Sequence, residues 1–254
     1  MIRVENIRKS FGDLEVLKGI TLDFYQGKTN IIIGRSGAGK TVLLKIIVGL
    51  YPPTSGKIYY GDRDFLSLNQ KQLRAIRMKV GMLFQQGALF DSMTIQENIR
   101  FPLDMFSTMT LKEKNSKVTE TLERVDLRGV DHLYPSEASG GMQKRVGIAR
   151  AIVLEPEYLF CDEPNSGLDP KTSILIDELI SDITQERNIT TIINTHDMNS
   201  VMEIGENIAL LNDGYLEWQG HKDEVLNSDN AELHRFIFAS PFLKKLRDKA
   251  LENQ

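Results

Sequence analysis

Eight residues constrain this chain more than any other part of its sequence. Residues 34–41 read Gly34-Arg35-Ser36-Gly37-Ala38-Gly39-Lys40-Thr41 and match the pattern G-x-x-x-x-G-K-[ST]. An apolar run precedes them and a second apolar run, Val42-Leu43-Leu44, follows, which gives the order of strand, loop and helix that this pattern requires. The sequence therefore predicts a loop whose glycines let backbone N–H groups surround a phosphate chain at a helix N-terminus.

Lys40 and Thr41 end this pattern, and each has its own expected role. The Lys40 ammonium is expected to reach the β- and γ-phosphates of a nucleotide, and the Thr41 hydroxyl is expected to bind Mg²⁺. The alternative is an ordinary glycine-rich turn between a strand and a helix. The apolar runs on both sides favour the phosphate-binding interpretation, because they supply the flanking elements that it needs.

Length and composition limit the classes of protein that remain. The 254 residues suffice for one core with an inserted subdomain, and 31 Lys and Arg against 35 Asp and Glu give a formal net charge of −4. This charge predicts no nucleic-acid binding. No apolar run approaches the ~18 residues of a membrane span, and the first residues lack a signal-peptide core, so we expect a cytosolic protein. The single cysteine, Cys161, excludes an intrachain disulfide and a cysteine-based metal cluster.

Apolar periodicity divides the chain into segments of different character. Short apolar runs predict strands at residues 2–4, 16–24, 57–60, 158–161, 190–194 and 208–212. Residues 70–152 have mostly helical spacing, broken at Pro102 and Pro135, and a helix is expected at residues 170–186. The sequence thus predicts an α/β fold: a P-loop NTPase core with a parallel sheet, an antiparallel β-subdomain and an inserted helical subdomain.

Polar side chains follow three of the apolar runs, at the strand ends where α/β sheets place ligands. Asp162 and Glu163 are adjacent acids, of which Asp162 suits Mg²⁺ and Glu163 can polarise an attacking water. His196 can donate to a γ-phosphate or hold Glu163, and the amide of Gln85 can touch Mg²⁺ or the attacking water. The alternatives are that the acids merely begin a loop, that the histidine is structural, and that Gln85 with Gln86 forms a generic polar loop.

A further segment gives these residues a common context. Residues 138–145 read Ala138-Ser139-Gly140-Gly141-Met142-Gln143-Lys144-Arg145 and precede a helix expected at residues 146–154. This run is similar to the signature loop of ATP-binding cassette (ABC) ATPases. The chain resembles that family in the whole order of its elements: phosphate loop, Gln85, signature, acid pair, Ser166-Gly167-Leu168-Asp169 and His196. The resemblance implies ATP hydrolysis, with ATP and Mg²⁺ as cofactors and Gln85, Glu163 and His196 as catalytic residues.

The same resemblance implies roles that the residues alone do not reveal. Phe11 occupies the place of the aromatic side chain that stacks on adenine. Ser139, Gly140 and Gly141 would contact the ATP that is bound by a second protomer, so two identical chains would form a homodimer around two ATP molecules. One departure is Ala138, where the family commonly has leucine, and we expect it to change local packing while activity is retained.

A finer resemblance lies in residues 84–94, which read Phe84-Gln85-Gln86-Gly87-Ala88-Leu89-Phe90-Asp91-Ser92-Met93-Thr94. This sequence is similar to that of the ATPase subunits of MCE-type phospholipid transporters, which maintain lipid asymmetry of bacterial outer membranes. It implies an integral membrane permease and an MCE-type lipid-binding protein as partners, and a place on the cytoplasmic face of the inner membrane. The alternatives are a nucleotide-dependent scaffold of an envelope or division complex, and a transporter for another substrate. The transported molecule and its direction are open.

The end of the chain has a separate apolar stripe. We expect an ABC ATPase domain over residues 1–230, with the helical subdomain inserted at about residues 86–156, and a C-terminal tail over residues 231–254. The stripe of the tail comprises Leu233, Phe236, Ile237, Phe238, Phe242, Leu243 and Leu246. The basic residues Lys244, Lys245 and Arg247 lie at its end. Such a stripe either packs on its own domain or crosses to the partner protomer of the dimer.

Overall fold

The computed structural model describes residues 1–225 and 227–237. The chain divides into two compact units, and each is described by itself. The first unit comprises residues 1–25 and 29–66 together with the chain from Asn194 onward, and the second comprises residues 26–28 and 67–193. The tail residues Phe238, Phe242, Leu243, Lys244, Lys245, Leu246 and Arg247 lie outside the described part, so the role predicted for the tail is a prediction still.

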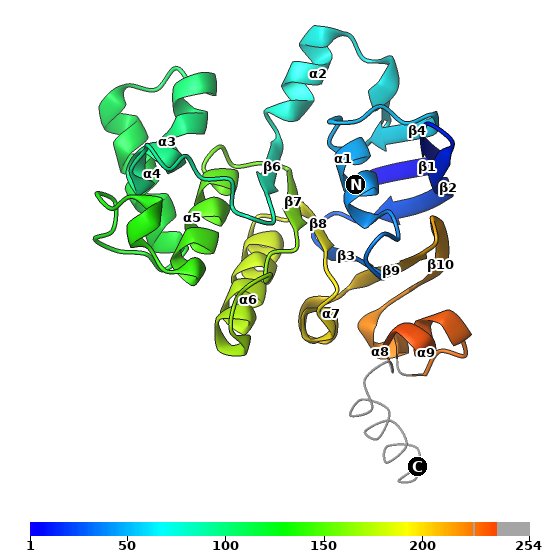
Figure 1. The fold of residues 1–254 in the computed structure, drawn as a ribbon. Coiled ribbons are helices and arrows are strands. Elements are labelled where there is room, and N and C mark those ends of the chain that lie inside the picture. The colour runs from blue at the N-terminus through cyan, green and yellow to red at the C-terminus, as the bar shows by residue number, and fades with distance from the viewer. Residues whose placement is uncertain (226, 238–254) are drawn as a thin grey trace. The chain divides into compact units, whose positions relative to one another are not determined.

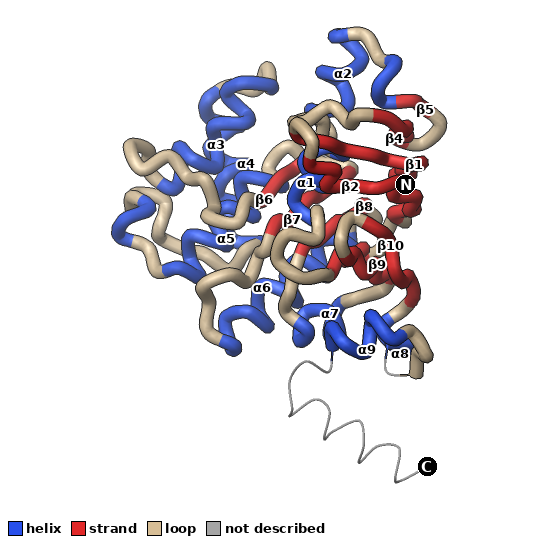
Figure 2. Tube along the Cα trace, turned by 45° about the vertical axis from the view of Figure 1, so that its right-hand side comes forward, coloured by secondary structure: helices blue, strands red, loops and turns tan. Residues whose placement is uncertain are grey.

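The first unit contains an antiparallel sheet, which confirms the predicted β-subdomain (Figures 1 and 2). Its strands run in the order β2-β1-β4-β5 and comprise β1 (Ile2–Phe11), β2 (Leu14–Phe24), β4 (Ser55–Tyr60) and β5 (Arg63–Asp64). Alternate side chains of β1, among them Ile2 and Val4, are fully buried, as expected for a sheet with one covered face. The strands are longer than predicted, because their exposed halves carry polar residues that the apolar runs do not include.

The same unit contains the strand that leads into the phosphate loop. β3 (Thr29–Ile33) pairs in parallel with β9 (Asn207–Asn212), and β9 pairs antiparallel with β10 (Tyr215–Gly220). β10 was missing from the predicted strands, although Asp213 and Gly214 both have positive φ and form the tight hairpin turn that this dipeptide favours. The helices of the unit are α1 (Lys40–Ile47), α7 (Met198–Ile204), α8 (Lys222–Val225) and α9 (Ala231–Ile237).

The second unit combines parallel strands with helices. β7 (Tyr158–Asp162) pairs in parallel with β6 (Val80–Leu83) and neighbours β8 (Thr190–Asn194), whose last residue is assigned to the first unit. The helices are α2 (Gln70–Arg77), α3 (Ile95–Phe106), α4 (Leu111–Arg124), α5 (Gly140–Ile152) and α6 (Pro170–Glu186). Figure 1 shows α3, α4 and α5 gathered in one group, and α3 packs against both of the others. These elements confirm the predicted α/β class with its helical segments.

Two predicted boundaries are wrong. Pro102 does not interrupt a helix, because it lies inside α3. The burial of Ile95, Ile99 and Leu103 on one face of α3 stabilises the helix although proline removes one of its hydrogen bonds. The helix expected from Val146 begins six residues earlier, at Gly140, so Gly140 and Gly141 form its first turn instead of a preceding loop.

Three helices of the second unit begin with the same device, the capping box. Asn69, Thr94 and Thr110 each accept a hydrogen bond from the backbone N–H three residues later, where a Gln or Glu side chain bonds back to the cap. This reciprocal pairing satisfies two backbone donors that a helix N-terminus otherwise leaves open. In the described residues, no helix is long and apolar enough to cross a membrane.

Candidate functional site

The phosphate loop of the first unit is shaped by its own glycines. Gly39 has φ 100° and precedes the first residue of α1, and Gly34 has φ 148° directly after β3. A Cβ atom on Gly34 would lie 2.2 Å from the backbone oxygen of Leu211, and one on Gly39 would lie 2.6 Å from a side-chain carbon of Leu17. Both positions therefore favour glycine, because each has a positive φ and a Cβ atom there would overlap a neighbour.

Lys40 lies folded against this loop. Its ammonium donates hydrogen bonds to the backbone oxygens of Gly34 at 2.7 Å and of Arg35 at 3.2 Å, and only 8 % of the residue is exposed. The charge thus lies against the backbone at the start of the loop. Thr41 is the second residue of α1, and Arg35, Ser36 and Gly37 form the exposed crest of the loop. This arrangement fits a Mg²⁺-bound nucleotide, with a hydroxyl next to the lysine.

Phe11 and His196 complete the predicted residues of the first unit. The Phe11 ring is 46 % exposed and meets the Tyr51 ring edge to face, with ring centroids 5.8 Å apart, and the Lys9 ammonium lies 4.9 Å from the Phe11 ring centroid. His196 is exposed and follows Thr195, whose N–H donates to the backbone oxygen of Ile32 at 3.1 Å. His196 therefore lies beside β3, the strand that leads into the phosphate loop.

Asp162 and Glu163 lie in the second unit, at the carboxyl end of β7. Asp162 is the last residue of the strand and is 6 % exposed. Glu163 has φ 50°, a left-handed conformation that is unfavourable for a residue with a side chain and often marks a functional turn. Asp162 thus ends the strand, and Glu163 begins the turn that follows it.

The loop that contains Gln85 follows β6, and helix α5 holds it from one side. The Lys144 ammonium donates to the backbone oxygen of Gln85. Six residues further along α5, Arg150 donates to the backbone oxygens of Gly87 at 2.7 Å and Ala88 at 2.8 Å. The contact with Lys144 fixes the backbone of Gln85. Its side chain is exposed, so the amide can reach a ligand.

Residues 90–94 continue this loop and are held by a buried side chain of α3. Asn98 is fully buried, and its amide oxygen accepts from the N–H of Phe90 at 2.8 Å. Its amide nitrogen donates to the backbone oxygens of Phe90, Met93 and Thr94 at 3.0–3.1 Å. We call residues 85–94 the glutamine loop; it is fixed by Lys144, Arg150 and Asn98, none of which belongs to it.

The signature residues cap helix α5. Ser139 is the N-cap residue, and its hydroxyl accepts from the N–H of Met142 at 3.3 Å. Ser139 and Gly140 are exposed and Gly141 is partly exposed, at the edge of a cavity of about 420 Å³ that Leu168 and Asp169 also line. Helix α5 thus begins at exposed residues, and a helix N-terminus is a favourable place for an anion.

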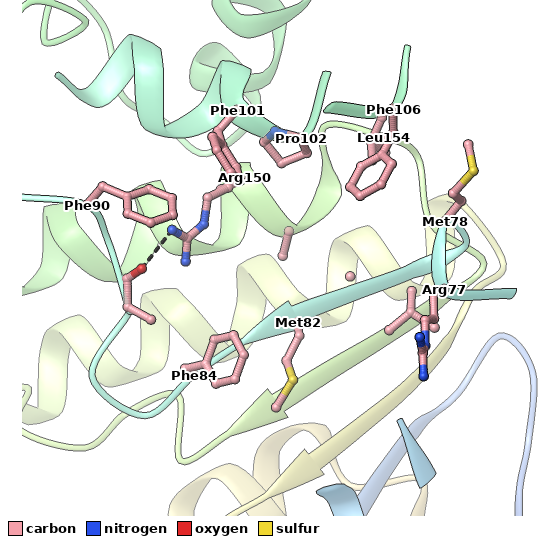
Figure 3. A pocket seen from close by; sticks show the side chains of 14 residues that line it. Arg77, Met78, Met82, Phe84, Phe90, Phe101, Pro102, Phe106, Arg150 and Leu154 are labelled. Carbon is pink, nitrogen blue, oxygen red and sulfur yellow. Dashed lines mark hydrogen bonds between the residues drawn. The ribbon is translucent and has the colours of Figure 1, made fainter. Parts of the chain in front are cut away.

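A second cavity of the same unit, of about 460 Å³, is apolar (Figure 3). We call it the aromatic groove. Phe90 and Phe101 face each other across one end, with ring centroids 4.9 Å apart, and the Arg150 guanidinium carbon lies 5.9 Å from the Phe90 ring centroid. The other lining side chains are mainly apolar and include Met78, Met82, Phe84, Pro102, Phe106 and Leu154.

The structure therefore brings the predicted residues together in two groups. The phosphate loop, Phe11 and His196 belong to the first unit, whereas Gln85, Asp162, Glu163 and the signature belong to the second. Lys144, Arg150 and Asn98 are parts of the site that the sequence patterns did not indicate. A signal was present in the spacing of Lys144 and Arg150 within a largely apolar helix, because charged side chains on a buried helix require partners.

Comparisons with known proteins show the family of the chain. Residues 17–166 match the family model described as ABC transporter. The chain is 38 % identical to a probable ribonucleotide transport ATP-binding protein of Mycobacterium leprae, over 93 % of this chain and 68 % of that protein. It is also 38 % identical to the methionine import ATP-binding protein of Geobacillus kaustophilus, over 89 % of this chain and 66 % of that protein. The chain thus spans about two thirds of the length of these relatives.

Solved structures match the fold as well. The dimeric cassette MJ0796, in a post-hydrolysis state bound to ADP and Pi, superimposes with a TM-score of 0.80 at 33 % identity, over 87 % of this chain and 99 % of that one. The cbiO1 protein of Clostridium perfringens superimposes with a TM-score of 0.83 at 27 % identity, over 97 % and 98 % of the two chains. The chain therefore belongs to the ABC transporter family and carries its ATP-hydrolysing domain, whose cofactors are ATP and Mg²⁺.

Proposed function

We propose that this chain is the ATPase subunit of an MCE-type phospholipid transporter of a bacterial envelope. The proposal rests on the glutamine loop. Its sequence is similar to that of such subunits, and its residues Ala88 and Phe90 line the aromatic groove. Hydrolysis in the ATPase domain would then drive a membrane permease that moves phospholipid between the inner and outer membranes, with an MCE-type protein as lipid carrier. The subunit would lie on the cytoplasmic face of the inner membrane.

The geometry of the aromatic groove supports a permease segment as its occupant. Phe84 and Phe90 are 36 % and 40 % exposed at the groove, although aromatic side chains of this size are usually covered. The backbone beneath Phe90 is fixed by Asn98 and Arg150, so a change at Gln85 would move the groove wall as one piece. The loop can therefore link events at Gln85 to a segment bound in the groove.

The residues of the ATPase site have the following proposed roles. The phosphate loop with Lys40 binds the phosphates, and Thr41, Gln85 and Asp162 bind Mg²⁺. Glu163 polarises the attacking water, assisted by His196 and Gln85. Phe11 stacks on adenine, and Ser139, Gly140 and Gly141 contact the ATP of a second copy of this chain in a homodimer.

A mixed-dimer experiment tests the homodimer with its shared sites. Chains that carry both Lys40→Ala and Ser139→Arg are mixed with wild-type chains, and hydrolysis by the mixed dimers is measured. If each signature serves the ATP of the other protomer, both sites of a mixed dimer contain one damaged half, and activity is lost. Half of the wild-type activity in mixed dimers would show that each chain completes its own site.

Two other functions compete with phospholipid transport. The identity to the methionine import protein favours an importer of a small solute, and a nucleotide-dependent scaffold would move no substrate at all. The discriminating experiment purifies the chain with its membrane partners and reconstitutes the complex in vesicles that contain a labelled phospholipid. We expect ATP-dependent transfer of the lipid. Transfer of methionine instead, or hydrolysis without any transfer, would contradict the lipid proposal and leave the ATPase assignment intact.

Variants of the aromatic groove test the coupling. Phe90→Asp should release the permease or uncouple hydrolysis from lipid transfer, with ATP binding unchanged. Leu111→Asp is the matched control, because Leu111 is 62 % exposed on α4 and does not line the groove. Equal loss of transfer in the control variant would show that the groove has no special part in the coupling.

A further inference from the structure

Lys144 is a buried cation with an unusual set of partners. Only 6 % of the residue is exposed, and its ammonium donates to the backbone oxygen of Gln85 and lies 3.5 Å from the backbone oxygen of Glu163. Lysine is rarely buried unless its charge is compensated, because transfer of an ammonium from water is costly. Burial accordingly lowers the pKa of Lys144. The side chain is therefore fixed where it is by these two carbonyl groups and the acids beside them.

The two carbonyls belong to segments that lie far apart in the sequence. One follows β6 and the other follows β7, the neighbouring parallel strand. Glu163 has its positive φ at this point, so its backbone is held in a conformation that its own side chain does not favour. The N–H of Ser166 donates to the Glu163 carbonyl at 3.2 Å, and Lys144 adds a second donor there while it also fixes the turn that presents Gln85.

Helix α5 supports this bridge through a row of residues three positions apart. Lys144, Gly147 and Arg150 lie along one face of the helix. A Cβ atom on Gly147 would lie 2.7 Å from a side-chain carbon of Leu83 and 3.8 Å from Gly87, so glycine allows the loop to approach closely. Arg150 holds the loop at Gly87 and Ala88. Lys144 is the member of this row that also reaches Glu163.

We propose that Lys144 is a positioning residue for ATP hydrolysis, whose ammonium ties the backbone of Gln85 to that of Glu163 and so presents both side chains to the reaction together. The proposal rests on the roles proposed above for Gln85 and Glu163. Binding of the phosphates belongs to the phosphate loop of the first unit, which Lys144 does not form. Loss of the ammonium should therefore lower kcat and leave the affinity for ATP nearly unchanged.

The first experiment compares steady-state hydrolysis by the full chain with Lys144→Met, Lys144→Arg and the control Lys112→Met, an exposed lysine of α4. A displacement of a reacting group by about 1 Å can lower a rate by about 10²-fold, so we expect kcat of Lys144→Met to fall roughly 10- to 100-fold with KM within about 3-fold. Lys144→Arg should restore part of kcat, because a guanidinium keeps the donors and Lys144 borders a cavity of about 310 Å³ that can accept it. Normal kcat in Lys144→Met would overturn the proposal.

The second experiment combines Lys144→Met with Glu163→Gln in single-turnover hydrolysis. If Lys144 acts through Glu163, the double variant should be no more than about 3-fold slower than Glu163→Gln alone, because coupled residues are not additive. The full product of the two single losses would show that Lys144 does not act through Glu163 and would overturn the proposal. Nucleotide binding by each variant is measured in parallel to verify its folding. Should Lys144→Met not fold, Lys144→Gln replaces it in both experiments with the same expected results.

Failure of this proposal can be told apart from failure of the proposed site. Near-normal turnover by Glu163→Gln would remove the role of Glu163, and the role of Lys144 with it. A slow Glu163→Gln together with a fast Lys144→Met would remove the role of Lys144 alone.

Discussion

The phosphate loop and the glutamine loop differ in where the side chains that hold their backbones come from. In the phosphate loop, glycines allow the turns of the backbone, and the buried cation Lys40, from the end of the loop itself, donates to two of its backbone oxygens. In the glutamine loop, the backbone oxygens and N–H groups are held by Lys144 and Arg150 of α5 and by Asn98 of α3. The glycines and the cation of the first loop all lie within one short sequence pattern. The second depends on helices that lie elsewhere in the chain.

The difference has a functional meaning. A loop whose cationic donor comes from its own end keeps that donor when other helices move, which suits the constant task of binding phosphates. A loop held by two helices follows those helices, which suits the transmission of a change from Gln85 to the aromatic groove. Predictions that separate local from distant support therefore test this comparison.

The largest expected effect concerns Gly34. Gly34→Ala places a Cβ atom 2.2 Å from a backbone oxygen at a residue with φ 148°. Steric overlap and backbone strain should together lower the free energy of unfolding by about 3–4 kcal/mol, measured by denaturant titration. Gly37→Ala is the matched control, because nothing lies within 4 Å of the place that its Cβ atom would take and only its φ of 84° is strained. Its loss should be about 1–2 kcal/mol. Equal losses would show that close packing does not shape this loop.

Lys40→Met is expected to have the next largest effect, and on binding rather than on stability. The methionine keeps the apolar stem and removes the ammonium, which we expect to contribute charge-assisted hydrogen bonds to the phosphates. Loss of such bonds should weaken ATP binding roughly 10- to 100-fold, measured by titration calorimetry. Affinity for adenosine, which lacks phosphates, should remain the same. A similar loss for adenosine would mean that the loop itself has changed shape.

Arg150→Met should behave in the opposite manner. It leaves the backbone oxygens of Gly87 and Ala88 without their cationic donor, and a lost hydrogen bond of this type costs about 1.5–3 kcal/mol. We expect the free energy of unfolding to fall by about 2 kcal/mol in denaturant titration, with the affinity for ATP within about 2-fold of wild type. A variant that lost ATP affinity but kept its stability would contradict the distinction between the two loops.

The smallest expected effect is a pH dependence at the end of the glutamine loop. The backbone N–H and hydroxyl of Thr94 donate to Glu97 and lower its pKa below the ordinary value of 4.5. A carboxylate with a lowered pKa stabilises the folded state above its ordinary pKa, and this contribution disappears as the pH falls through the lowered value. Glu97→Gln should therefore reduce stability slightly at pH 7 and flatten its decline below about pH 4.5, measured by thermal unfolding across this range. An unchanged acid profile would mean that the pair is not formed in solution.

The same contrast explains how much of the molecule the sequence could predict. The α/β class, β3 and the phosphate pattern follow from short runs of residues, since apolar periodicity and glycine spacing are local properties. The start of α5 was misplaced, because Gly140 and Gly141 disfavour a helix and only the Ser139 cap and packing allow one there. Lys144, Arg150 and Asn98 could not be assigned to the glutamine loop, because no local pattern shows which carbonyl a distant side chain will reach.

Strand β7 has a final consequence for experiments on this protein. Its fourth residue, Cys161, is the one cysteine of the chain, and it is fully buried next to Asp162. Burial raises the pKa of the thiol, which disfavours the reactive thiolate while the strand is buried in the folded protein. A thiol reagent can therefore modify the natural protein only when β7 opens to solvent. The rate of this labelling therefore measures how often β7, the strand that ends at the acid pair, opens to solvent. A cysteine added at the surface can carry a dye, because the native cysteine is not labelled while β7 is closed.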